Sequence, residues 1–133
     1  MPRYRHFDGP ALFRQGFRPF FLGAGLWSFG VVAFWLVIVS GMVSIPTAFG
    51  PAAWHAHEMI FGYATAVIAG FLLTAIPNWT GRMPLQGLPL IVLFGSWVIG
   101  RVVMAVSALF GPGLTAALDL SFLAILIVVV LRE

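Results

Sequence analysis

The sequence predicts an all-α membrane protein whose four transmembrane helices run up-down-up-down. Three observations support this fold class: an apolar composition, four long apolar segments, and short connections that contain glycine or proline. Hydrophobic residues make up 61% of the 133 residues and charged residues only 8%, so the chain lacks the polar surface of a soluble domain. Its mean hydropathy is +1.03. No cysteine is present, which excludes disulfide bonds and thiolate ligands.

Each apolar segment is about as long as a helix must be to cross a hydrocarbon core of about 30 Å. The turns between the segments carry glycine and proline, as tight connections between helices require. No linker or domain boundary is visible, so residues 1–133 are expected to form a single polytopic domain. The predicted helices cover residues 20–43, 57–76, 88–110 and 114–131, each bound being approximate.

Arginine placement orients the predicted bundle, because basic residues near helix ends are retained on the cytoplasmic side. All basic residues except Arg101 lie before the first helix, between the second and third, or after the fourth: Arg3, Arg5, Arg14, Arg18, Arg82 and Arg132. Both termini are therefore expected in the cytoplasm and the other two turns outside. These scattered charges form no basic patch, which excludes nucleic acid as a partner.

A short segment before the first helix, about residues 8–18, is predicted to lie in the headgroup layer of the bilayer. Phe13 and Phe17 recur four residues apart, as do Arg14 and Arg18, which suits one helix with aromatic and basic faces. Pro19 fits the first turn of the spanning helix. A role as membrane anchor and orientation signal is favoured over a more specific one.

Polar residues gather in the stretch WHAHEMIFGY, at the predicted outer end of the second helix, where His55, His57 and Glu58 lie together. On the third and fourth helices, Arg101 and Asp119 fall at a matching depth of about 8–10 Å, counted at about 1.5 Å per residue. An isolated charge at this depth costs about 2–3 kcal/mol or more, so we expect an Arg101–Asp119 ion pair. Such a pair suits a structural latch between helices and a brace for a functional site equally well.

Helix geometry limits what the histidines can do together. Positions two apart point to nearly opposite faces, so His55 and His57 share one ion only if the backbone there is extended. His55 and Glu58, three apart, can share a face. His6 falls on the other side of the bilayer, about 30 Å away. One chain therefore supplies too few histidines for a haem held by two imidazoles. If the site held a haem, its second axial ligand would be methionine, water, an exogenous ligand such as a diatomic gas, or a residue of another polypeptide.

Methionines fall in the same predicted layer, with Met42 at the end of the first helix and Met104 near the outer end of the third. Thioether and imidazole ligands together suit copper, especially Cu(I). Methionine is also a common filler of apolar cores, which is its more frequent role. The histidine motif has a plain alternative as well, with Trp54 as an interface aromatic and Glu58 favourable near a helix N-terminus.

Small residues recur at every fourth position of the second helix, beginning one turn after Glu58. Such a stripe allows another helix to approach closely, or leaves a flat wall against which a planar macrocycle could lie. Close helix packing is the more frequent explanation. The stripe consists of Gly62, Ala66 and Gly70, continued by Thr74.

The chain resembles the N-terminal part of the NnrS family of bacterial inner-membrane proteins. The resemblance rests on residues 12–23, 54–63 and 69–82, and it continues through 88–90 to 100–101. It implies a haem- and copper-containing protein of the nitric oxide response that protects cells against nitrosative stress. Our leading hypothesis is that the protein binds or handles nitric oxide or the metal complexes that nitric oxide forms. His55, His57 and Glu58 match the histidine-rich motif of the family, and Arg82 and Arg101 match its arginine positions.

NnrS proteins are typically much longer, with further helices and histidines. The chain is therefore expected to be a fragment, a short form, or one part of an assembly with a partner chain or further copies of itself. Beside the haem and copper function, two alternatives stay open: a non-catalytic module for assembly or metal carriage, and a proton or redox relay subunit. No nucleophile with a paired base, phosphate loop or carboxylate dyad is present, so the sequence does not decide whether the protein is an enzyme.

Overall fold

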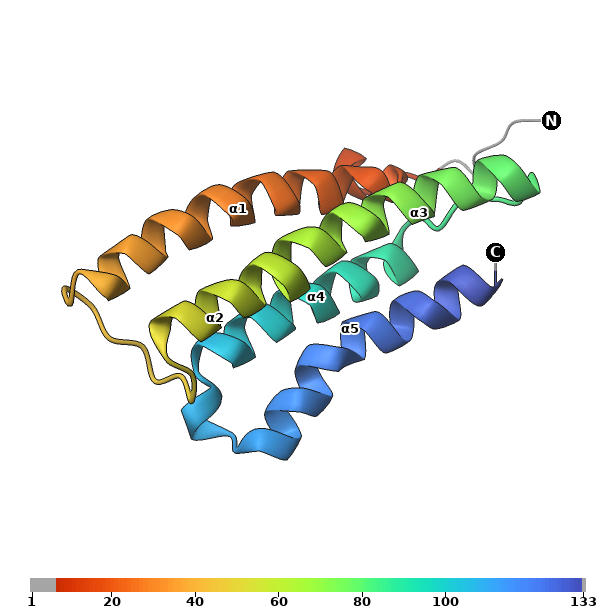
Figure 1. Ribbon diagram of the computed structural model, residues 1–133. Coiled ribbons are helices and arrows are strands. Elements are labelled where there is room, and N and C mark those ends of the chain that lie inside the picture. The colour runs from red at the N-terminus through yellow and green to blue at the C-terminus, as the bar shows by residue number, and fades with distance from the viewer. Residues whose placement is uncertain (1–6, 133) are drawn as a thin grey trace.

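In the computed structural model, which describes residues 7–132, every regular element is helical, and four helices are long and apolar enough to cross a membrane. This confirms the predicted fold class. The start of α1 and the end of α5 lie at one end of the bundle, and two turns lie at the other (Figure 1). The elements are η1 (Ala11–Arg14), α1 (Phe17–Val39), α2 (Pro51–His57), η2 (Glu58–Ala64), α3 (Thr65–Thr80), α4 (Leu88–Ala105), η3 (Ser107–Leu109) and α5 (Pro112–Arg132).

The second transmembrane helix is continuous from Pro51 to Thr80 and comprises α2, η2 and α3. It begins earlier than the predicted bound near residue 57, because Pro51 occupies the first turn, where its missing N–H has no helical partner. The segment η2 is a π-helix, with hydrogen bonds one residue longer than in an α-helix. No residue pattern in this segment indicates the change of pitch.

Two other helices end earlier in the structure than the sequence predicted. The first helix ends at Val39, not near residue 43, because Gly41 turns the chain away with a φ of 78°. The third ends at Ala105, not near residue 110, and passes through Val106 into the 3₁₀ turn η3. The apolar residues continue past both points, so hydropathy overestimated the length of these two helices.

The N-terminal segment does not form the single interfacial helix that was predicted. After the 3₁₀ turn η1, Gln15 is extended, so Phe13 and Phe17 do not share a helical face. Phe13 packs against Phe94 of α4, with ring centroids 6.3 Å apart, and its carbonyl oxygen accepts a hydrogen bond from the Gly87 amide at 3.0 Å. The segment is therefore fastened to the chain before α4.

The small-residue stripe is a packing surface against α1. A Cβ at Gly70 would lie 2.8 Å from the Phe21 ring, and Ala66 is fully buried. A Cβ at Gly62 would lie 2.6 Å from Nε1 of Trp27. Side chains of α1 thus occupy the space that the stripe leaves, which decides for close helix packing over an open wall.

Candidate functional site

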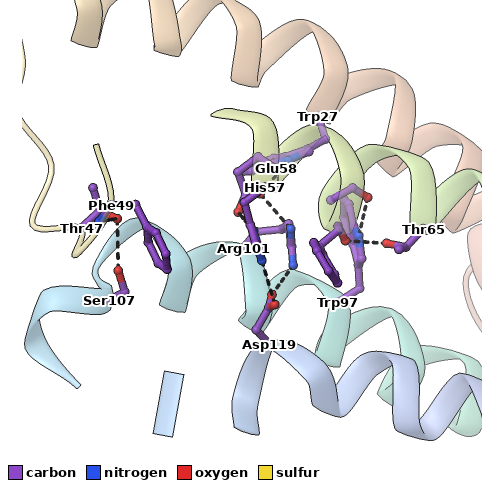
Figure 2. A network of polar contacts seen from close by, with 12 residues as sticks. Trp27, Thr47, Phe49, His57, Glu58, Thr65, Trp97, Arg101, Ser107 and Asp119 are labelled. Carbon is purple, nitrogen blue, oxygen red and sulfur yellow. Dashed lines mark hydrogen bonds and ion pairs between the residues drawn. The ribbon is translucent and has the colours of Figure 1, made fainter. Parts of the chain in front are cut away.

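Glu58 lies at the centre of a buried polar cluster in the interior of the bundle. Its side chain is fully buried at the first residue of η2. Oε2 accepts hydrogen bonds from Arg101 Nη1 at 2.9 Å and from Trp27 Nε1 at 3.1 Å. Helices α1 and α4 therefore both donate to a carboxylate of the second transmembrane helix (Figure 2).

Arg101 also forms the contact with Asp119 that the depth argument anticipated. Its Nη2 lies 2.5 Å from Asp119 Oδ1, and both side chains are buried. Gly100 permits this approach of α4 to α5, since a Cβ there would lie 3.2 Å from the same oxygen. One guanidinium thus bridges the carboxylates of two other helices, which is the arrangement that buried charges need.

His57 completes a ring of contacts between the two carboxylates. Its Nε2 lies 3.1 Å from Asp119 Oδ2, and its Nδ1 lies 3.4 Å from Glu58 Oε1. The imidazole also stacks on Phe61, with centroids 4.6 Å apart. We refer to His57, Glu58, Arg101 and Asp119 as the charge network (Figure 2).

Side chains support the π-helical turn that carries Glu58. The Trp97 indole on α4 donates from Nε1 to the carbonyl oxygen of Gly62 at 2.9 Å. The Thr65 hydroxyl donates to the carbonyl oxygen of Phe61 at 2.5 Å. Carbonyl groups in and after a π turn otherwise lose part of their regular helical pairing. The π-helical segment and the charge network therefore share Glu58, and both are held by hydrogen bonds from α4.

His55 has different surroundings from His57. It lies in the helical segment α2, so the extended backbone that would let both histidines hold one ion does not occur. Its ring stacks on Trp35, with centroids 4.5 Å apart, and its Nδ1 is buried without a hydrogen-bond partner. His55 thus carries a free ring nitrogen, whereas both nitrogens of His57 are engaged.

A cavity of about 600 Å³ adjoins the charge network at the end of the bundle that carries the turns. His57 and Asp119 contribute to its lining, and Met104 lies there too. The remaining lining residues are Ala48, Phe49, Phe61, Ser107, Ala108, Gly111, Pro112, Thr115, Ala116 and Leu120.

The family model that describes the NnrS protein matches residues 11–133, nearly the whole chain. The chain belongs to the NnrS family. This membership supports, at a general level, a multi-pass membrane protein of the nitric oxide response. No curated protein and no solved structure matches the chain significantly.

The other residues that the sequence singled out in this NnrS family chain are dispersed. Met42 is 78% exposed after α1 and is not part of the cavity lining. Trp54 is buried and packs edge-on against Phe34, so its side chain is not on the bundle surface, where an interface aromatic would contact lipid head groups. With Trp54 inside and Glu58 in an ion pair, the plain capping interpretation of the motif fails.

The described arginines other than Arg101 make contacts at the end of the bundle opposite the cavity. Arg82 donates to the carbonyl oxygen of Arg132. Arg18 donates to the side chain of Gln15 at 3.1 Å and to the carbonyl oxygen of Ala11 at 2.9 Å, and the carbonyl oxygen of Arg14 accepts from Gln86. His6 lies outside the described residues.

Sequence reasoning missed Trp27, Trp97 and Thr115. Trp27 and Trp97 lie near the middle of their apolar segments, not at the ends where interface aromatics are enriched, which was a usable signal. Their partners, Glu58 and the carbonyl oxygen of Gly62, are identified only by the three-dimensional contacts. Thr115 had a usable signal, because it precedes Asp119 by one helical turn and shares its face. Among residues 7–132, no group of three histidine, aspartate or glutamate side chains has the arrangement of a metal site.

Proposed function

We propose that this chain is a haem- or copper-binding protein of the nitrosative stress response in the bacterial inner membrane, with His55 as its metal ligand near the outer face. Family membership supports the general assignment. The observation that supports His55 is its buried Nδ1, which has no partner although unpaired polar atoms are costly in an apolar interior.

The residues fit a metal to different degrees. The ring of His55 is held by Trp35 but engages no acceptor in the part of the chain that is described, so it can ligate without breaking a contact. Ligation by Nε2 of His57 would first displace Asp119 at 3.1 Å. Met104 is buried and lines the cavity, whereas His55 does not, so its thioether is not proposed as a ligand of the metal at His55.

Haem iron or copper, when bound, would supply an open coordination position for nitric oxide. The charge network has a structural role in this proposal and does not bind the metal. By joining α4, α5 and the second transmembrane helix at Glu58, it fixes the helix that presents His55, which lies three residues before Glu58. The network therefore acts as a brace, the second of the two roles left open for the ion pair.

Spectroscopy and metal analysis of the purified protein test the assignment. We expect a Soret band and bound metal in the wild type and in His6→Ala, and their loss in His55→Ala. His57→Ala is expected to lower stability while retaining the Soret band in the folded fraction. A colourless, metal-free and folded wild-type protein contradicts the proposal, and a band that survives His55→Ala contradicts the choice of ligand.

A second candidate function is a proton relay. It is favoured by His57, whose two ring nitrogens contact carboxylates on different helices. A histidine between two carboxylates can accept a proton on one side and release it on the other. Proton flux into vesicles containing the protein, measured with an internal pH dye, should then disappear in His57→Ala and remain in His55→Ala.

A further inference from the structure

The cavity beside the charge network has the features of a ligand site. Its volume of about 600 Å³ lies within the usual range of about 300–1,000 Å³ for small-molecule pockets. Its walls are mainly apolar and come from the connection before α2, from the ends of α2 and α4, from η2 and η3, and from the first turns of α5. Ala116 and Leu120 of α5 are also exposed on the molecular surface, so an apolar molecule could reach the cavity from lipid.

One polar group in this lining lacks a partner. Thr115 is only 5% exposed, and its Oγ1 makes no hydrogen bond. Helical threonines can donate to the carbonyl four residues back, as Thr74 does to Gly70 at 2.9 Å, but Thr115 does not. A buried hydroxyl left unpaired is unfavourable, so a ligand oxygen at this position would satisfy it.

Two rings define a slot in the same cavity. Phe49 and His57 are nearly parallel, at 20°, with centroids 6.4 Å apart. His57 also makes a closer ring contact with Phe61, with centroids 4.6 Å apart. A third ring between two parallel rings needs about 7 Å, twice a contact distance of about 3.5 Å. Phe49 lies on an exposed connection and can make this small shift.

The charges near the cavity indicate a neutral ligand. Oδ1 of Asp119 is paired with Arg101 and Oδ2 with His57, so neither oxygen needs a bound cation. The guanidinium of Arg101 is divided between two carboxylates and offers no free charge to an anion. A molecule that binds here is therefore selected by shape, stacking and a hydrogen bond.

We propose that the cavity binds the head group of a lipid-soluble quinone. A quinone is neutral and planar, its carbonyl oxygen can accept from the Thr115 hydroxyl, and its tail suits entry from the bilayer. The ring would stack between Phe49 and His57. This inference goes beyond the proposed metal function and does not depend on it, since His55 takes no part in the cavity lining.

Photoaffinity labelling of the intact protein in nanodiscs tests this site. The probe is an azido-ubiquinone with a decyl tail, and the competitors are decylubiquinone and 1-decanol. We expect labelled peptides from residues 46–49 or 112–120, with labelling suppressed by excess decylubiquinone but not by 1-decanol. Thr115→Val, which keeps the shape but removes the hydroxyl, should weaken binding about five- to tenfold.

Three further variants separate the site from a general effect on folding. Phe49→Leu removes the outer ring and should weaken labelling, while Thr115→Ser restores the hydroxyl and should retain it. Thr74→Val is the matched control, because it makes the same change in α3, outside the cavity. Labelling elsewhere, equal competition by 1-decanol, or wild-type labelling of both Thr115→Val and Phe49→Leu would overturn the proposal.

Discussion

Asp119 makes two buried contacts, one to Arg101 and one to His57. Asp119→Asn keeps the size of the side chain but removes its charge. Breaking a buried ion pair costs about 3–5 kcal/mol, because the remaining charge loses its partner. Arg101 still has Glu58 here, so we expect a loss of about 2–3 kcal/mol in unfolding free energy, measured in detergent.

The double variant Arg101→Gln/Asp119→Asn is the control for this change. If the two residues act as a pair, the cost of the double variant is smaller than the sum of the single costs. Strict additivity, or an Asp119→Asn protein as stable as the wild type, would contradict the proposed coupling.

At Gly62 the charge network and Trp27 leave no room for a side chain. A methyl group there would lie 2.6 Å from Trp27 Nε1 and 3.0 Å from Arg101 Nη1, the two donors to Glu58. Gly62→Ala should destabilise the protein by about 1–3 kcal/mol through overpacking. Gly25→Ala is the matched control, since nothing lies within 4 Å of its Cβ position. Both are measured by thermal unfolding, and equal midpoints would refute the packing argument.

Contacts between residues could be predicted where the depth of the two residues in the membrane decides the contact. They could not be predicted where the contact involves a change of helical pitch. Arg101 and Asp119 could be matched because antiparallel helices of regular rise bring equal depths together. The contact of Glu58 with Arg101 is made from the first residue of a π-helical segment, and no residue pattern in η2 indicates such a segment. The separate surroundings of His55 and His57 needed the position of Trp35, which lies on another helix.

At the scale of elements, the connection after α1 is tied to η3. The Ser107 hydroxyl accepts a hydrogen bond from the Ala48 amide at 2.9 Å and pairs with the Thr47 hydroxyl at 3.1 Å. Ser107→Ala should make the Ala48 amide exchange with solvent about tenfold faster, corresponding to about 1.4 kcal/mol. Hydrogen exchange with mass spectrometry measures this rate.

Ser28→Ala serves as the control for that experiment, because its hydroxyl donates only to the carbonyl oxygen of Gly25 within α1. An unchanged exchange rate at Ala48 in Ser107→Ala would show that the amide contact of Ala108 with Pro46 holds the connection by itself.

Helix positions could be predicted from hydropathy, but the ends could not. The second helix starts at Pro51 although its first turns contain polar histidines, which lowered the apolar signal there. The first and third end before their apolar runs do, because Gly41 and the turn η3 interrupt the helices. Hydropathy reports preference for lipid, whereas helix ends depend on backbone conformation.

At the scale of the whole molecule, the start of α1 and the end of α5 lie at the same end of the bundle, so we expect both on one side of the membrane. The absence of cysteine makes this testable with single introduced thiols. In intact cells, a maleimide that cannot cross the membrane should label Ala48→Cys and Ala108→Cys but not Met83→Cys. All three positions are exposed, so access is decided by sidedness. The reverse pattern would invert the orientation inferred from arginine.

The charge network also has a consequence for biogenesis. Translation delivers Glu58 to the membrane 43 residues before Arg101, whereas Arg101 and Asp119 are separated by only 18 residues. The third and fourth spans can therefore enter lipid as a hairpin that carries its own counter-charge. The second span has His57 and Trp27 as earlier partners of Glu58, but its arginine partner comes only with that hairpin. Until then we expect it to stay beside the insertion machinery or a water-filled defect. Membrane integration of this chain is thus expected to be completed from its C-terminal half.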